Sequence, residues 1–235
     1  MPPKNDVIFI QPPNDGDKIP QYKQSIVVNI FHFYIIDEIG DPRDFLDMIN
    51  ILKTAEEHDT IFIYLNTPGG SLQTTIQILG AIQQCQGTVV TCLEGEVCSA
   101  GTLIFLTGDR HIVNQNCTFM IHNYSQWLGG KGNEVALRVK YSELFFRKLA
   151  FDIYGGFLSE DEINCMMEGK DYWMTSEMVV ERLNLRNELL KKDIETETIN
   201  SIKTETIDAV TEKLIEQEQN QHVAVKARKS KIKKI

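Results

Sequence analysis

The sequence predicts an α/β protein whose mainly parallel β-sheet is built from repeated β-α-β units. Short runs rich in β-branched and aromatic residues alternate with amphipathic stretches of ten residues or more. Strands separated by helices of that length pair in parallel, and the helices cover the sheet. The 235 residues are 42% hydrophobic and 24% charged, a balance typical of a globular protein with a core of its own.

The expected elements follow one another in a regular order. The run "IVVNIFHFYIID" at 26–37 has the composition of a strand. The stretch 41–58 begins with acidic residues and a proline, and its apolar residues recur at helical spacing, so we expect an amphipathic helix there. Further strands are expected at 60–66, 87–95, 111–113 and 117–121, and further helices at 72–85, from about 99, at 132–156, at 158–169 and at 175–185.

Two of these helices carry clear end signals. The long helix at 132–156 ends in Gly-Gly, a pair that commonly stops a helix. The helix at 158–169 opens with a Ser-x-x-Glu capping box formed by Ser159 and Glu162.

Composition divides the chain into three parts. Residues 1–25 are rich in proline and are expected to form an irregular N-terminal arm. Residues 26–185 hold the expected strands and form the main domain. From 186 onward Glu, Thr, Lys, Asn and Gln dominate, so 186–235 is expected to be a helical, partly disordered extension. Its end, 226–235, holds six Lys or Arg and no acid, which is more typical of a solvated tail than of a segment that touches an anionic surface.

Bulk properties exclude several function classes. A net charge of −9 argues against nucleic acid as the main partner. The five cysteines form no C-x-x-C pair, which indicates free, mostly buried thiols in a reducing cytoplasm rather than disulfides or a zinc site. The first residues lack the apolar core of a signal peptide, and no run of 18 apolar residues could span a membrane. We therefore expect a cytoplasmic protein.

One serine lies where an amide hydrolase would place its nucleophile. Ser99, in "VCSAG", follows a buried strand and opens a helix. The first N–H groups of a helix lack intrahelical partners, so the N–H of Ala100 could donate to an oxyanion. By itself, a serine in this position is more simply explained as a helix cap.

Three more motifs supply the other groups that amide hydrolysis needs. In "NTPGGS", the N–H of Gly70 could be a second oxyanion donor, although an ordinary turn explains the glycines as well. His122 ends the apolar run "CTFMIH", where it is either a general base or a histidine bonded to a backbone carbonyl. Asp171, in "EGKDYW", is expected in a loop between two helices and is either an orienting carboxylate or a surface charge.

In their order along the chain, four segments resemble the successive signatures of the Clp protease proteolytic subunit family, the ClpP-like serine peptidases. They are "YLNTPGGS", "GEVCSAGTLIFLTG", "FMIHNYSQWLGGKG" and "EGKDYWMTSEMVVERL". The resemblance covers roughly 26–185. It implies a ClpP/crotonase-like fold with a long protruding helix. It also implies Ser99 as nucleophile, His122 as general base, Asp171 as the orienting carboxylate, and the N–H groups of Gly70 and Ala100 as the oxyanion hole.

The resemblance also implies an assembly and a role. Family members form homo-oligomeric rings, a heptamer or a double ring, and hydrolyse peptides inside the chamber. We expect no metal or cofactor, with ATP used only by a partner AAA+ unfoldase in protein degradation. The same family includes phage-encoded head-maturation proteases, which would act in the host cytoplasm with a phage assembly protein. Two further alternatives are a catalytically silent ring scaffold and a crotonase-type acyl-CoA enzyme, whose oxyanion hole also uses two backbone N–H groups.

The sequence departs from the family pattern near the expected site. Ala100 stands in place of the usual methionine after the nucleophile, and only its N–H is required. Asn123 and Tyr124 replace the frequent Gln-Pro after the base, and the Leu-Gly-Gly at 128–130 comes late. Because this loop shapes the substrate groove, we expect the cleavage preference to differ from that of other members.

A second departure concerns the expected docking groove for the unfoldase. Phe62 and Tyr64 keep the aromatic character of that groove, whereas Gln84, Cys92 and Glu94 stand where larger apolar residues are expected. A carboxylate in an apolar docking site carries a desolvation cost. These departures argue against a standard unfoldase partner and leave the expected peptidase chemistry unchanged.

Overall fold

The computed structural model describes residues 8–9, 22–23, 27–192 and 195–196. The chain divides into two units, 1–182 and 183–235. The expected domain limits at 25/26 and 185/186 stay predictions. All the strands described below, and all five residues of the predicted site, belong to the first unit.

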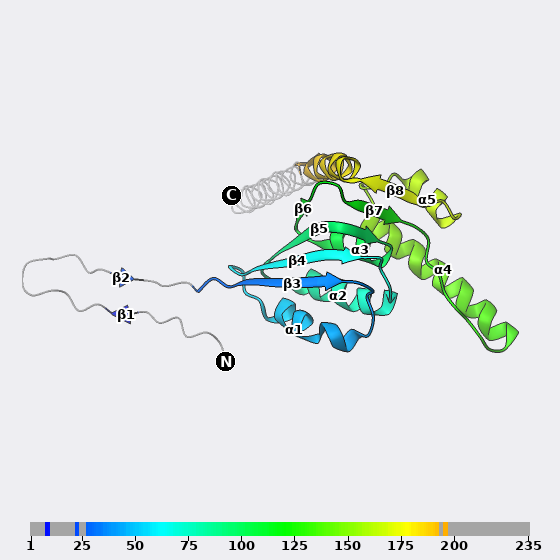
Figure 1. Ribbon diagram of the computed structural model, residues 1–235, viewed down its shortest axis with the longest axis horizontal. Helices are drawn as coiled ribbons and strands as arrows, with labels where there is room; N and C mark the ends of the chain where they lie inside the picture. The colour runs from blue at the N-terminus through cyan, green and yellow to red at the C-terminus, as the bar shows by residue number, and fades with distance from the viewer. Residues whose placement is uncertain (1–7, 10–21, 24–26, 193–194, 197–235) are drawn as a thin grey trace, which may run out of the picture. The chain divides into compact units, whose positions relative to one another are not determined.

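A six-stranded, mostly parallel sheet forms the centre of the first unit (Figure 1). Five strands follow one another across it in the order β3 (Ile30–Ile36), β4 (Thr60–Thr67), β5 (Thr88–Cys98), β7 (Thr118–Ile121) and β8 (Tyr172–Thr175). β6 (Arg110–Val113) pairs with the first part of β5, and β7 pairs with its last part. Only β7 and β8 are antiparallel neighbours in this sheet. The expected α/β class is confirmed.

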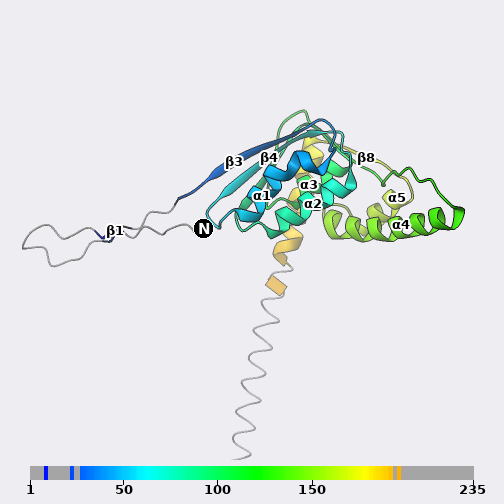
Figure 2. The same cartoon turned by 90° about the horizontal axis from the view of Figure 1, so that it is seen from below.

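Three helices cover one face of the sheet. They are α1 (Leu46–Thr54), α2 (Leu72–Gln84) and α3 (Ala100–Thr107), which lie on the same side of β3 and β4 in Figure 2. The alternation along β4 explains this arrangement, because Ile61, Ile63 and Leu65 are fully buried while the residues between them are not. In α3 every residue from Ala100 to Leu106 is buried, so this helix lies inside the core.

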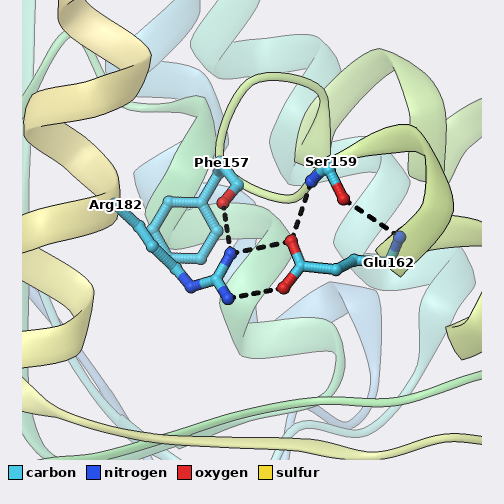
Figure 3. A network of polar contacts seen from close by, with 4 residues as sticks. All are labelled: Phe157, Ser159, Glu162 and Arg182. Carbon is cyan, nitrogen blue, oxygen red and sulfur yellow. Dashed lines mark hydrogen bonds and ion pairs between the residues drawn. The ribbon is translucent and has the colours of Figure 1, made fainter.

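Two later helices match the expected end signals. α4 (Gly132–Tyr154) is mostly exposed in its first half, which extends away from the sheet in Figure 1, and it buries Phe146, Ala150, Ile153 and Tyr154 near its end. α5 (Glu160–Met167) begins with the predicted capping box of Ser159 and Glu162, drawn in Figure 3. Arg182 also bonds to Glu162.

Several expected boundaries need correction. The strand expected from 26 begins at Ile30, and Asn29 just before it donates both its N–H and its side-chain amide to Asp59. The helix expected over 41–58 is a 3₁₀ turn at Pro42–Phe45 followed by α1. β5 continues three residues past its expected end at 95, since Gly95 adopts a φ of +67° where the pairing with β4 shifts register.

The strand β8 was not expected, and it corrects the surroundings of Asp171. The sequence predicts Asp171 in a loop between two helices. The structure places it between α5 and β8, directly before Tyr172. Four residues between two helical patterns carry too little alternation to predict a strand, and only pairing with β7 creates it.

The remaining described parts lie outside the sheet. Within the arm expected to be irregular, β1 (Ile8–Phe9) and β2 (Tyr22–Lys23) form a short antiparallel pair. Residues 176–182 are helical in the first unit, and 183–192 and 195–196 are helical in the second. The basic tail at 226–235 lies outside the described residues.

The cysteines and the helices match what their composition predicts. All five cysteines are free thiols; Cys92, Cys98 and Cys117 are buried, whereas Cys165 is exposed. None of the helices in the described ranges has both the length and the apolar character needed to cross a bilayer.

Candidate active site

Ser99 lies at the sharp turn between β5 and α3. It is one of three non-glycine residues with positive φ in the described part of the chain, with φ +54° and ψ −124°. Its N–H donates to the carbonyl of Met120 in β7 over 2.8 Å. Its side chain makes no capping hydrogen bond, so the simpler explanation as a helix cap does not account for the hydroxyl. A strained strand-to-helix turn of this kind typically presents a nucleophile.

The turn at Gly69 and Gly70 packs directly against Ser99. A Cβ atom at Gly69 would lie 2.7 Å from the Cβ of Ser99, and Gly69 has φ +101°. Gly70 has φ +143°, and a Cβ there would lie 2.3 Å from the carbonyl oxygen of Ile39. Only glycine fits at both positions. The close approach of Gly69 to Ser99 brings the neighbouring Gly70 backbone near the nucleophile turn, as an oxyanion donor requires.

His122 and Asp171 lie at the same end of two paired strands. His122 directly follows β7, and Asp171 directly precedes β8. The antiparallel register pairs Ile121 with Tyr172. Continuing that register by one residue places His122 opposite Asp171. Because Ser99 bonds to Met120, the same strand also brings His122 close to Ser99.

A cavity of about 520 Å³ opens at this point. Its lining includes Gly70, Ser99, Ala100 and His122, four of the five predicted site residues. Asp171 is not among the lining residues, and the strand register alone relates it to the site. Much of the remaining wall is apolar or aromatic, and comes from Leu72, Ile76, Leu103, Phe145, Phe146 and Tyr154.

The family of this chain follows from its similarity to known protein families. The model of the Clp protease family matches residues 40–182, more than half of the chain. The chain belongs to the Clp protease family. The predicted resemblance is thereby confirmed, and membership supports a protease function.

Individual relatives are similar at low identity. The ATP-dependent Clp protease proteolytic subunit of Borreliella afzelii is 26% identical over 150 residues, which cover 61% of this chain and 75% of that protein. Subunit 1 of Borreliella burgdorferi is 27% identical over 150 residues, covering 61% and 76% respectively. The subunit of Streptococcus gordonii is 28% identical over 131 residues, covering 54% and 66%.

A cysteine next to Ser99 could compete as nucleophile in this Clp family member. Cys98 is buried, and its thiol lies 3.2 Å from a carboxylate oxygen of Glu96. Burial, and secondly the hydrogen bond to Glu96, raise the pKa of the Cys98 thiol to about 12. The thiol is therefore protonated at neutral pH, which leaves the Ser99 hydroxyl as the better candidate.

The loop after His122, where this chain departs from other Clp proteases, is tied to both neighbouring helices. The side-chain amide of Asn123 donates to the carbonyl of Met167 over 2.9 Å. The ring of Tyr124 meets that of Phe146 edge to face, with centroids 5.3 Å apart. Asn123 and Tyr124 thus hold the loop against α5 and α4 beside the cavity.

Sequence reasoning missed two polar residues behind Ser99. Thr102 in α3 and Tyr154 at the end of α4 are both fully buried, and their hydroxyls lie 2.8 Å apart although they are 52 residues apart in sequence. A threonine inside the otherwise apolar run "AGTLIFL" was the available signal. Its partner could not be found without the tertiary structure.

Proposed function

We propose that this Clp family member is a serine endopeptidase with Ser99 as nucleophile. The observation that carries the proposal is the positive-φ turn at Ser99, packed against the Gly69–Gly70 turn, with His122 lining the same cavity. In the proposal His122 is the general base and Asp171 orients it from the adjoining strand. The N–H groups of Gly70 and Ala100 form the oxyanion hole.

The proposed reaction is acyl transfer to Ser99 followed by hydrolysis. The Ser99 oxygen attacks the peptide carbonyl while His122 takes the hydroxyl proton. The tetrahedral oxyanion lies against the two N–H groups, and His122 then passes its proton to the leaving amine. Water hydrolyses the acyl-enzyme, again with His122 as the base. Each step uses only this chain's own groups and water, so we propose no metal or cofactor.

The cavity walls support a preference for substrates with an apolar side chain beside the cleaved bond. Leu72, Ile76 and Leu103 line it, and so do aromatic residues of α4. Burying an apolar side chain there gains roughly 25 cal/mol for each Å² removed from water. A charged side chain would lose its hydration without a charged partner in return.

We further propose that the chain works as a ring with a protein substrate. Exposed apolar residues on α4 support contact between copies, namely Leu137, Tyr141 and Leu144. The proposal of an ATP-driven unfoldase partner is supported by an aromatic cluster on β3 and β4. In it the rings of Tyr34 and Tyr64 stack, with their centroids 4.7 Å apart. Cys92, expected at this surface, is buried and offers no docking area. A cytoplasmic site of action follows from the same proposal.

A fluorophosphonate probe tests the peptidase proposal. The Ser99 oxygen would form a bond to phosphorus, fluoride would leave, and the hydroxyl proton would pass to His122. We expect labelling of the wild-type chain and its complete loss in Ser99→Ala, together with loss of peptide cleavage. Cys98→Ala is the matched control, and should still be labelled. A wild-type chain that assembles into rings but resists the probe would favour the silent scaffold instead, and acyl-CoA binding without peptidase activity would favour the crotonase-type enzyme.

A further inference from the structure

The carbonyl oxygen of Ser99 accepts two hydrogen bonds from a single residue, Thr102. Thr102 donates to it twice, through its backbone N–H at 3.0 Å and through its side-chain Oγ1 at 2.6 Å. Thr102 is fully buried, so no water competes for these bonds. The second bond fixes the Ser99 carbonyl more firmly than an ordinary helix start does.

The hydrogen bond between Thr102 and Tyr154 has a defined direction. A threonine hydroxyl has one hydrogen, and Thr102 uses it on the Ser99 carbonyl. The hydroxyl of Tyr154, 2.8 Å away, is therefore the donor to Thr102 Oγ1. The result is a chain of hydrogen bonds from Tyr154 through Thr102 to Ser99, in which each bond polarises the next.

This chain of bonds acts on one of the proposed oxyanion donors. The Ser99 carbonyl and the Ala100 N–H belong to the same planar trans peptide and point in opposite directions. Fixing the carbonyl toward Thr102 therefore fixes the N–H of Ala100 toward the cavity, which Ala100 lines. A carbonyl that accepts strong hydrogen bonds also makes the N–H of its own peptide a better donor.

The same bonds explain how the strained turn persists. The backbone conformation of a non-glycine residue at φ +54° and ψ −124° costs of order 1–3 kcal/mol. It persists only where contacts with neighbouring residues hold it in place. Met120 holds the Ser99 N–H, and Thr102 holds its carbonyl. Tyr154 anchors Thr102 to α4, the helix whose aromatic residues also line the cavity.

We propose that the buried hydroxyl pair of Thr102 and Tyr154 is a positioning device that aims the Ala100 N–H at the reaction's oxyanion. The inference rests on the proposed peptidase function and adds two positioning residues to it. Thr102 and Tyr154 are both fully buried, so removing their hydroxyls should slow the chemical step without weakening substrate binding.

Four single variants and the double variant Thr102→Val/Tyr154→Phe test this device. Thr102→Val keeps the shape and removes the hydroxyl, whereas Thr102→Ser keeps the hydroxyl. Tyr154→Phe removes only the upstream donor. Thr107→Val is the matched control, because Thr107 Oγ1 bonds to the carbonyl of Leu103 at the far end of the same helix. For each variant, kcat and KM of a fluorogenic peptide and the fluorophosphonate labelling rate are measured, with thermal unfolding as a check of folding.

The expected pattern is specific to positioning. Thr102→Val should lower kcat and the labelling rate by about 10-fold with KM unchanged. Thr102→Ser should recover most of the loss, and Thr107→Val should behave as wild type. Tyr154→Phe should have a smaller effect, about 3-fold, and should add little in the Thr102→Val background because the two hydroxyls act in series.

Other results overturn the inference. If wild type cleaves peptides and folded Thr102→Val cleaves them with the same kcat, the hydroxyl does not position the turn. If Thr102→Val and Thr107→Val lose activity equally and in proportion to their loss of thermal stability, the role is only structural. A folded, ring-assembled wild-type chain that neither cleaves nor reacts with the probe overturns the proposed peptidase function, and this inference with it.

Discussion

Arg182 donates two hydrogen bonds to the carboxylate of Glu162, at 2.6 and 3.0 Å (Figure 3). A third bond from Arg182 reaches the carbonyl of Phe157 at 3.0 Å. The same carboxylate accepts the N–H of Ser159 and so completes the capping box of α5. Asp171 and β8 lie in the sequence between Glu162 and Arg182. The ion pair therefore closes the two ends of the segment that carries the proposed orienting carboxylate.

Breaking this ion pair should destabilise the protein. Glu162→Gln leaves Arg182, whose side chain is only 23% exposed, without its charged partner. We expect a loss of about 1–3 kcal/mol in the free energy of unfolding, measured by urea denaturation. Glu160→Gln, in the same first turn of α5 but exposed, should change it by less than about 0.5 kcal/mol. Equal effects of the two substitutions would show that the pair contributes nothing.

The pair should also make stability depend on pH in the acid range. The hydrogen bonds from Arg182, and secondly those from Ser159, lower the pKa of Glu162 from 4.5 to about 2. A carboxyl whose folded pKa is depressed contributes its full stability above the unfolded value and loses it as pH falls through the folded one. The stability difference between wild type and Glu162→Gln should thus be constant above pH 4.5 and shrink toward pH 2. Urea titrations at pH 7, 5 and 3 measure it, and a difference that is the same at all three would contradict the shift.

Gly70 should tolerate no side chain. Gly70→Ala combines a positive φ with a Cβ only 2.3 Å from a backbone oxygen of Ile39, so the turn beside Ser99 must move. We expect a loss of about 2 kcal/mol or more in stability and a labelling rate at least about 10-fold lower. Gly80→Ala is the control, since Gly80 lies in α2 with nothing within 4 Å of the added Cβ, and should stabilise by about 0.5–1 kcal/mol. A Gly70→Ala protein as active and stable as wild type would rule out the close approach.

The strand register predicts a role for Asp171 that can be measured directly. Asp171→Asn keeps the shape but removes the charge that would orient His122. We expect the labelling rate at neutral pH to fall about 10³–10⁴-fold with the fold intact. Asp161→Asn, on the exposed side of α5, should label at the wild-type rate. Wild-type labelling of Asp171→Asn would remove Asp171 from the proposed triad and require another orienting group.

Much of the fold followed from local patterns because its core elements are long or strongly periodic. The alternation in "TIFIYLN" and the helical spacing in 72–85 each allow one structure that buries their apolar residues, and β4 and α2 match them closely. The capping box of α5 is a local signal too, and was confirmed. The short β8 was missed because its hydrogen bonds depend wholly on β7.

The sequence by itself determined the α/β class, the family and the residue types available for catalysis. Its four ordered motifs named Ser99, His122 and Asp171 without showing how close they lie. The tertiary structure decided the backbone conformation of Ser99, its contact with Gly69 and the strand register that pairs Ile121, next to His122, with Tyr172, next to Asp171. It alone revealed the buried bond between Thr102 and Tyr154. The reason is physical: propensity and periodicity act over a few residues, whereas strain, close approach and buried hydrogen bonds exist only where distant segments pack together.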